Sequence, residues 1–206
     1  MPRRFQNVTG FVLAGGESRR MGRPKQGLVL GGQTMLQRQL RLLTQVCRET
    51  FIVGSQAAPH GGEVPALPDV FPGRGPLGGI YTGLARTCSE YNLVVSCDLP
   101  FLRSEFLEYL CHQAIRSSAD VTVPQTADHG LQPLCAVYRR RMRRIIRASL
   151  DSGNGKISRV FPKVRCEILD GRELARKRFS QAIFVNMNTP AEYDAARRRI
   201  EGRYRF

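Results

Sequence analysis

A short apolar run that stops at two glycines and is followed by several cations restricts most strongly how this chain can fold. The run is Phe11-Val-Leu-Ala14, with Gly15-Gly16 directly after it and Arg19, Arg20 and Lys25 within the next ten residues. Glycine lets the backbone approach an anion closely and adopt positive φ at little cost. Successive backbone N–H groups in such a turn bind anions, and arginine and lysine neutralise phosphates. The segment therefore predicts a strand, a tight turn and a phosphate-binding loop.

This loop does not match the better-known phosphate-binding fingerprints. It has neither the Gly-Lys-Ser/Thr ending of a Walker A loop nor the G-x-G-x-x-G pattern of dinucleotide-binding folds. A glycine turn with a solvated basic flank is the alternative interpretation of the same residues. Three cations so close to the glycine pair favour the phosphate site.

Strand and helix patterns alternate along the chain, which predicts an α/β fold. Apolar residues recur at helical spacing over 34–47, and short apolar runs bounded by turn residues are typical of buried strands. We expect one Rossmann-like, doubly wound domain over 1–206 with a mainly parallel sheet. A second glycine-rich loop at 73–79 is expected before a helix, and a helix capped by Ser104 after the central strand. The expected strands are 8–14, 50–53, 92–97, 121–123, 134–138, 164–169 and 183–185.

Polar residues near strand ends are the candidate site, because ligands of such sheets gather at the carboxyl ends of strands. Asp98 follows a buried strand and is suited to hold Mg²⁺, a hard cation that prefers oxygen ligands. Asn186 and Asn188 are two residues apart, so in an extended segment both amides point to the same side. Asp69 precedes the second glycine loop and could accept hydrogen bonds from a base or ribose. Each also has a plainer interpretation as a turn or cap residue.

Composition limits the classes of partner. The 206-residue chain carries a net charge of +15, with basic runs at 139–144, 172–178 and 197–199. Such a charge points to an anionic partner, namely nucleic acid, an acidic protein, a membrane surface or a phosphorylated small molecule. No stretch approaches 18 apolar residues, so no membrane span is expected. Cysteines inside apolar runs without C-x-x-C spacing indicate reduced, buried thiols and a cytoplasmic location.

Five ordered segments carry a family resemblance over essentially the whole chain. Residues 13–25 closely resemble the signature of the molybdenum cofactor guanylyltransferases, which are MobA-like members of the wider Rossmann-like nucleotidyltransferases. The later motifs of that family resemble Gly75-Pro-Leu-Gly-Gly79, Cys97-Asp-Leu-Pro-Phe101, Gln132-Pro-Leu134 and Asn186-Met-Asn-Thr-Pro190, in this order. The resemblance implies a fold of the nucleotide-diphospho-sugar transferase type.

The resemblance also implies roles for individual residues. Catalysis would involve Arg20, Lys25 and Asp98, with Arg20 neutralising phosphates and Asp98 holding Mg²⁺. The residues implied to contact the nucleotide are Leu13, Ala14, Gly15, Gly16, Lys25, Asp69 and Asp98. Those implied to line the site near the second substrate or the metal are Gly78, Gly79, Asn186 and Asn188. The chain departs from the family pattern at two places. Residues 53–55 are Val-Gly-Ser, where the family can carry an asparagine that helps bind the nucleotide, and residues 130–133 are Gly-Leu-Gln-Pro in place of the family's segment there.

The implied reaction transfers GMP from GTP to the terminal phosphate of molybdopterin, or of the molybdenum cofactor, and releases pyrophosphate. A phosphate nucleophile is already anionic at neutral pH, so the reaction needs no strong general base. The absence of an arranged Ser–His pair from the sequence therefore does not argue against this reaction. Catalysis would come from positioning and charge neutralisation.

A cytidylyltransferase acting on molybdopterin or another phosphorylated acceptor is the nearest alternative. A basic nucleic-acid-binding protein would explain the net charge, but the late arginines lack interleaved aromatics. A further hypothesis is that the basic stretch from Arg139 to Arg147 docks an acidic acceptor, either a molybdoenzyme or its chaperone.

Overall fold

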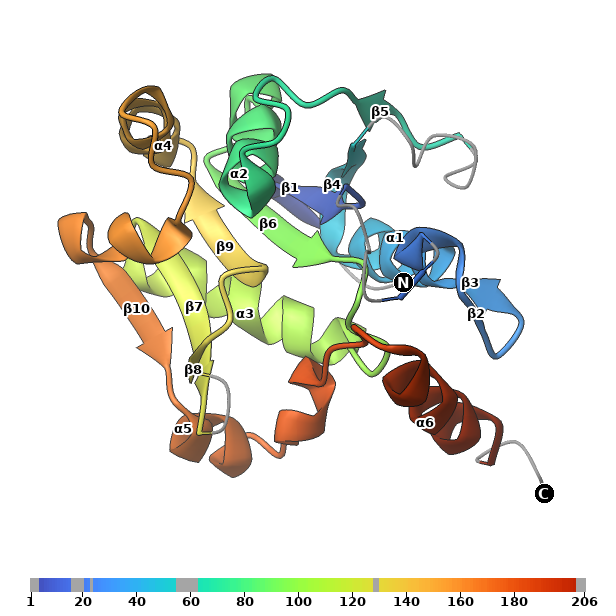
Figure 1. Ribbon diagram of the computed structural model, residues 1–206. Helices are drawn as coiled ribbons and strands as arrows, with labels where there is room; N and C mark the ends of the chain where they lie inside the picture. Colours follow the sequence, from blue (N-terminus) through green and yellow to red (C-terminus); the bar gives the residue numbers. More distant parts are fainter. Residues whose placement is uncertain (1–3, 16–20, 23, 55–62, 128–129, 203–206) are drawn as a thin grey trace.

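The main sheet has eight strands, mostly parallel. A computed structural model describes residues 4–15, 21–22, 24–54, 63–127 and 130–202. The strand order is β10-β7-β9-β6-β1-β4-β5, with β8 paired to β7 (Figure 1). Only β9 and β8 run antiparallel to their partners. The strands are β1 (Phe5–Leu13), β4 (Cys47–Val53), β5 (Ala66–Leu67), β6 (Tyr91–Ser96), β7 (Val121–Thr126), β8 (Gly130–Leu131), β9 (Cys135–Arg139) and β10 (Cys166–Leu169).

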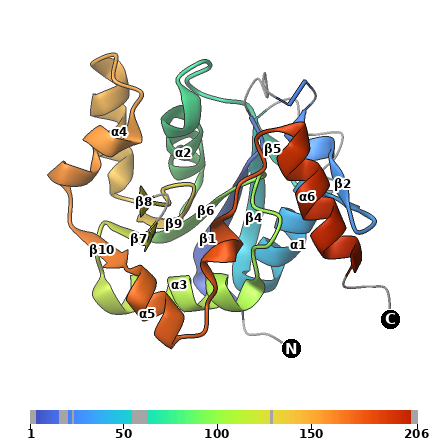
Figure 2. The same cartoon turned by 60° about the horizontal axis from the view of Figure 1, so that its bottom comes forward.

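Helices cover both faces of this sheet, which confirms the predicted doubly wound α/β architecture. Figure 2 shows α2 and α4 on one side and α1 and α3 on the other. Because side chains alternate along β1, Val12 packs with the α1 and α3 side and Phe11 with the α2 and α4 side. The helices are α1 (Met35–Val46), α2 (Gly75–Arg86), α3 (Ser104–Ser117), α4 (Met142–Asp151), α5 (Gly171–Arg176) and α6 (Pro190–Glu201).

The predicted helix over 34–47 is confirmed as α1. Thr34 caps it: its hydroxyl accepts from the N–H of Gln37, while the Gln37 side chain accepts from the N–H of Thr34. A hairpin of β2 (Val29–Leu30) and β3 (Gln33–Thr34), which the sequence analysis missed, leads into this helix. Its two-residue turn is Gly31-Gly32, both with positive φ. The signal was present, since a Gly-Gly pair between extended residues is typical of tight hairpins.

Helix α6 packs against this hairpin and shares a buried cluster with Met21, which precedes Lys25. That cluster also contains Leu30 of β2, Ile200 of α6 and Met187, which lies before α6. The Tyr193 hydroxyl donates to the carbonyl of Val29 at 2.8 Å. Pro190 and Thr189 take the helix-start positions predicted for them.

Three local predictions were wrong. The second glycine loop is largely helical, because α2 begins at Gly75. Arg103, not Ser104, is the N-cap of α3, and no side chain caps that helix. Residues 183–185 are not a strand, since Gln181–Phe184 form a 3₁₀ turn capped by Ser180. Such a short apolar run has no period that distinguishes a strand from a turn whose apolar side chains are buried.

No helix in the described part of the chain combines the length and hydropathy needed to cross a bilayer.

Candidate functional site

Two neighbouring parallel strands end together and place the candidate site. Leu13 of β1 lies opposite Ser96 of β6. The carbonyl of Leu13 accepts from the N–H of Cys97 at 3.3 Å, and the N–H of Ala14 donates to Val53 of β4 at 2.9 Å. Backbone hydrogen bonding between the strands therefore continues one residue past β1 and one past β6, and the N–H of Ala14 takes part in it. The first loop and Asp98 consequently start from the same edge of the sheet.

Lys25, Asp98 and Asn188 meet at this edge, and we call them the Lys25–Asp98–Asn188 cluster. The ammonium of Lys25 donates to Asp98 Oδ2 at 3.3 Å and to Asn188 Oδ1 at 2.5 Å. The second oxygen of Asp98 accepts from the Ser96 hydroxyl at 2.6 Å. The side chains of Lys25 and Asp98 are 19% and 21% exposed, so the pair is accessible to a ligand. Three predicted residues, distant in sequence, are thus in direct contact.

The turn that carries Asp98 is held from two sides. The Met187 N–H donates to the carbonyl of Asp98 at 2.9 Å. From α1, the side chain of the fully buried Gln39 donates to the carbonyl of Leu99 at 2.7 Å. Hydrogen bonds inside a low-dielectric interior hold such geometry well. The position of Asp98 is therefore fixed by residues of two other segments.

Helix α6 positions Asn188 in a similar way. The carboxylate of Glu192 accepts from the N–H of Asn188 at 2.6 Å and from that of Thr189 at 2.9 Å. Glu192 thereby completes a capping box with Thr189, and the backbone hydrogen bond from Asn188 lowers the pKa of Glu192. The start of α6 consequently anchors the amide that contacts Lys25.

Asp69 lies beside the first loop. A substituent on the α-carbon of Gly15 would be 3.7 Å from Asp69 Oδ2. The other carboxylate oxygen, Oδ1, is buried and has no hydrogen-bond partner among the described residues. Burial raises the pKa of Asp69, and the Thr82 hydroxyl acts in the opposite direction. An unpartnered buried oxygen next to this loop is available to a ligand donor.

The glycines near the site allow close backbone approach. Gly54 has φ +119°, and a Cβ there would be 2.9 Å from the Gly15 nitrogen. A Cβ on Gly78 would be 2.8 Å from the carbonyl oxygen of Phe71. Gly79, the next residue of α2, faces the side chain of Leu13 in β1. Packing of α2 accounts for Gly78 and Gly79, and their predicted ligand contacts stay a prediction.

Other predicted residues are not joined to the cluster. Gly16 and Arg20 lie outside the described residues. Asn186 is half-buried and makes no hydrogen bond with any described residue, so only one amide of the pair is brought to Lys25.

Sequence reasoning missed Ser96, Gln39 and Glu192, which position the cluster. Ser96 and Asp98 are two residues apart at a strand end, and that spacing places both on one side. Glu192 follows Thr189 by three residues, which is the capping-box spacing. The hydrogen bond from Gln39 to the carbonyl of Leu99 has no signature in the sequence, because it depends on how α1 packs.

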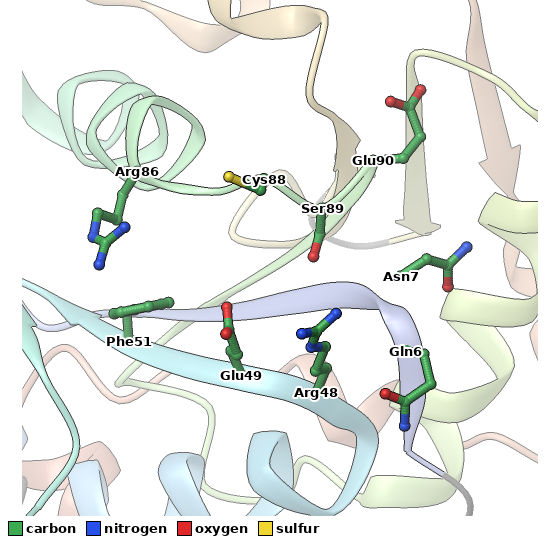
Figure 3. A pocket seen from close by; sticks show the side chains of 9 residues that line it. All are labelled: Gln6, Asn7, Arg48, Glu49, Phe51, Arg86, Cys88, Ser89 and Glu90. Carbon is green, nitrogen blue, oxygen red and sulfur yellow. The ribbon is translucent and has the colours of Figure 1, made fainter.

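A hollow of about 420 Å³ lies at the opposite edge of the sheet, near the starts of β1 and β4 (Figure 3). Arg48 and Arg86 line it together with Glu49 and Glu90, so its charges are balanced. The guanidinium of Arg86 lies 5.4 Å from the centroid of the Phe51 ring. None of the predicted site residues is in this hollow.

A doubly wound sheet with a carboxylate and a lysine meeting at its carboxyl edge fits the class of the Rossmann-like nucleotidyltransferases, and the comparisons with known proteins show that class. The model of the MobA-like NTP transferase domain matches residues 10–166. A protein of Desulfosudis oleivorans named "Molybdenum cofactor guanylyltransferase" is 34% identical over 94% of this chain and 96% of its own. Another, from Pelotomaculum thermopropionicum and named "Probable molybdenum cofactor guanylyltransferase", is 36% identical over 92% of both chains.

The solved structure of molybdopterin-guanine dinucleotide biosynthesis protein A from Archaeoglobus fulgidus has the same fold. Its TM-score is 0.83 at 22% identity, covering 94% of this chain and 99% of that one. The chain therefore belongs to the MobA-like NTP transferase family, and it is a nucleotidyltransferase. The resemblance found in the five motifs is confirmed.

Proposed function

We propose that this chain transfers GMP from GTP to the terminal phosphate of molybdopterin or the molybdenum cofactor, with release of pyrophosphate. The observation that carries the proposal is the Lys25–Asp98–Asn188 cluster at the shared carboxyl edge of β1 and β6. The names of the relatives support guanine as the base. Transfer of CMP, and nucleic-acid binding by the basic surface, are the alternatives that the experiment below separates.

The residues of this chain act by positioning and by neutralising charge. GTP would lie across the first loop, with Gly15 allowing close approach and Asp69 Oδ1 accepting from the base or ribose. Lys25 would neutralise the phosphates as a point charge, and Arg20 is proposed to assist it. No general base is required, because the attacking phosphate oxygen is already ionised. The protein has only to hold two anions in line.

The side chains of the cluster fit Mg²⁺. Asp98 offers a carboxylate and Asn188 an amide oxygen, which are ligands that this hard cation prefers. We therefore assign Asp98 as the metal ligand, with Asn188 beside it. When bound, Mg²⁺ would neutralise charge on the phosphates.

The acceptor would lie along the same edge, toward β7. Strands β6 and β7 both run antiparallel to β9, so their carboxyl ends face the same way. A hollow of about 570 Å³ near the end of β7 is lined by Thr126, Gln125 and Gln181. Gln132, from a motif of the resemblance, donates to the Thr126 hydroxyl at 3.3 Å and so helps shape this region.

An acidic acceptor protein, a molybdoenzyme or its chaperone, would dock on the basic surface formed by α4 and the turn before it. Arg140 and Arg144 are exposed and form no ion pair with a described residue, whereas Arg141 is paired with Asp120. Reversal of charge at 140 and 144 should impair delivery of the product to an acidic acceptor without changing its synthesis. Unchanged delivery would exclude this docking face.

The function is tested by the mass of the product. Purified protein is incubated with Mg²⁺, molybdopterin with or without molybdenum, and each of the four NTPs separately. A guanine dinucleotide formed with GTP alone supports the proposal. A cytosine dinucleotide formed with CTP would show that the chain is a cytidylyltransferase instead. If no NTP gives a product and the protein instead binds RNA or DNA with steep salt dependence, the nucleic-acid alternative is correct.

A further inference from the structure

The ammonium of Lys25 lies where two oxygen ligands converge. Its nitrogen is 2.5 Å from Asn188 Oδ1 and 3.3 Å from Asp98 Oδ2. These two oxygens are the ones that the proposed function assigns to the neighbourhood of the divalent cation. We call the point between them the cation position. In this structure the ammonium of Lys25 lies at it.

The carboxylate of Asp98 and the backbone of Asn188 are held independently of Lys25. The Ser96 hydroxyl takes the other oxygen of Asp98, which leaves Oδ2 directed at the cation position. The Met187 N–H holds the backbone of Asp98, and Glu192 holds the N–H of Asn188. Removal of Lys25 would therefore leave Asp98 Oδ2 in place, with the backbone that carries the Asn188 amide held beside it.

Lys25 itself is attached less firmly. It begins a single 3₁₀ turn, Lys25–Gly27, that no side chain caps, and its long side chain has many rotamers. Among the described residues its hydrogen-bond partners are Asp98 and Asn188, and the pair with Asp98 is 3.3 Å long and about one-fifth exposed. The side chain can thus leave the cation position without disturbing the core.

We propose that Lys25 is an exchangeable occupant of the cation position, which a divalent cation displaces so that the amine becomes free to bind nucleotide phosphate. The inference rests on the proposed function of the site. An ammonium and a divalent cation cannot share the same two oxygens, because like charges a few ångströms apart repel strongly in a partly buried site. Metal alone must compete with Lys25, and nucleotide removes that competition by accepting the amine. Metal and nucleotide therefore bind cooperatively.

The test measures binding of Mn²⁺ in the absence of nucleotide, by the electron paramagnetic resonance signal of the free ion. Lys25→Met keeps the length of the side chain and removes its charge. We expect this variant to bind Mn²⁺ about tenfold more tightly than the wild type, within the range of ordinary coupling energies. Lys163→Met, at an exposed position away from the cluster, is the matched control for loss of one positive charge and should bind as the wild type does.

A second measurement uses the wild-type chain and does not depend on how a variant folds. The chain has four lysines, so acylation of each amine by an amine-reactive ester can be followed by peptide mass. Saturating Mn²⁺ without nucleotide should accelerate acylation of Lys25 and leave Lys163 and Lys177 unchanged. This result separates displacement from a general electrostatic effect of the charge.

Failure of this inference is distinguishable from failure of the proposed function. If the wild type binds Mn²⁺ with GTP but Lys25→Met gains no affinity without it, the exchange is wrong and the nucleotide site stands. Unchanged acylation of Lys25 at saturating Mn²⁺ overturns the exchange in the same way. If no Mn²⁺ binds even with GTP, both the metal assignment and the exchange fall.

Discussion

The pairs Lys25–Asp98 and Arg147–Asp151 both join opposite charges, but they are built differently. Arg147 and Asp151 are four residues apart on α4, each 51% exposed, with nitrogen–oxygen distances of 2.8 and 2.9 Å. Lys25 and Asp98 are 73 residues apart, about one-fifth exposed, and separated by 3.3 Å. The Arg147–Asp151 pair has the shorter nitrogen–oxygen distances, whereas the Lys25–Asp98 pair is less exposed to solvent.

The comparison shows that polar groups from distant segments meeting at one point, rather than a short distance between two charges, mark the functional site. An exposed i,i+4 pair adds little to stability and is screened by salt. The cluster instead gathers oxygen donors from β6 and from the start of α6 around one cation. Such an arrangement fixes polar groups in advance, which is what electrostatic catalysis requires. Breaking each region should therefore have different consequences.

The largest effect is expected from Asp98→Ala. It should lower kcat by about 10³-fold or more, because one preorganised electrostatic group can contribute that much and Asp98 is also the assigned metal ligand. Asp98→Asn, which keeps an acceptor for Ser96, should be as inactive. The melting temperature of both should stay close to that of the wild type. Near-normal turnover of either variant would falsify the assignment of Asp98.

The next largest effect is expected from Lys25→Ala, with a loss of about 10²-fold in kcat/KM for GTP. Lys163→Ala is the control, since it removes the same charge from an exposed position. Steady-state kinetics at fixed Mg²⁺ distinguish the two. Equal losses in both variants would mean that overall charge, and not this position, matters for activity.

Much of the architecture could be predicted from the sequence, because periodicity and strand-end residues are local signals. Apolar spacing located α1, and the runs at 92–97 and 121–123 fell on β6 and β7. The register of strands and the antiparallel direction of β9 are tertiary facts that no local pattern encodes. Residues 183–185, which overlap the 3₁₀ turn Gln181–Phe184, were mistaken for a strand because so short an apolar run has no distinguishing period.

For the site, the sequence supplied the residue types and the structure supplied the partners. Asp98 and Asn188 stood out as polar residues near the ends of predicted strands, but their meeting with Lys25 depends on where α6 packs. Arg20 and Gly16 carry predicted roles that stay predictions. Gln39 could not be found, because a buried glutamine on an apolar helix face has no sequence signature of its contact.

A smaller effect should come from Thr189→Ala, compared with Thr34→Ala. Both hydroxyls cap a helix through the same capping box, so each substitution should cost about 1 kcal/mol of unfolding free energy. That corresponds to a fall in melting temperature of about 2–4 °C for a chain of this size. Only Thr189→Ala loosens the segment that carries Asn188, so it should lower kcat several-fold more than Thr34→Ala, whose helix reaches the site only through Gln39. Equal kcat values in the two variants would show that Asn188 is not positioned by the start of α6.

The smallest effect should come from Arg147→Ala. The side chain lies at the surface, where its pair with Asp151 and its position 5.0 Å from the Phe71 ring are both exposed to water. Turnover should not change, and any fall in melting temperature should diminish between low and high salt, because the Debye length shortens. Thermal unfolding at two ionic strengths and kinetics at one measure both quantities. A loss of turnover comparable with that of Lys25→Ala would mean that α4 takes part in the reaction, and the distinction between local and convergent charge pairs would no longer hold.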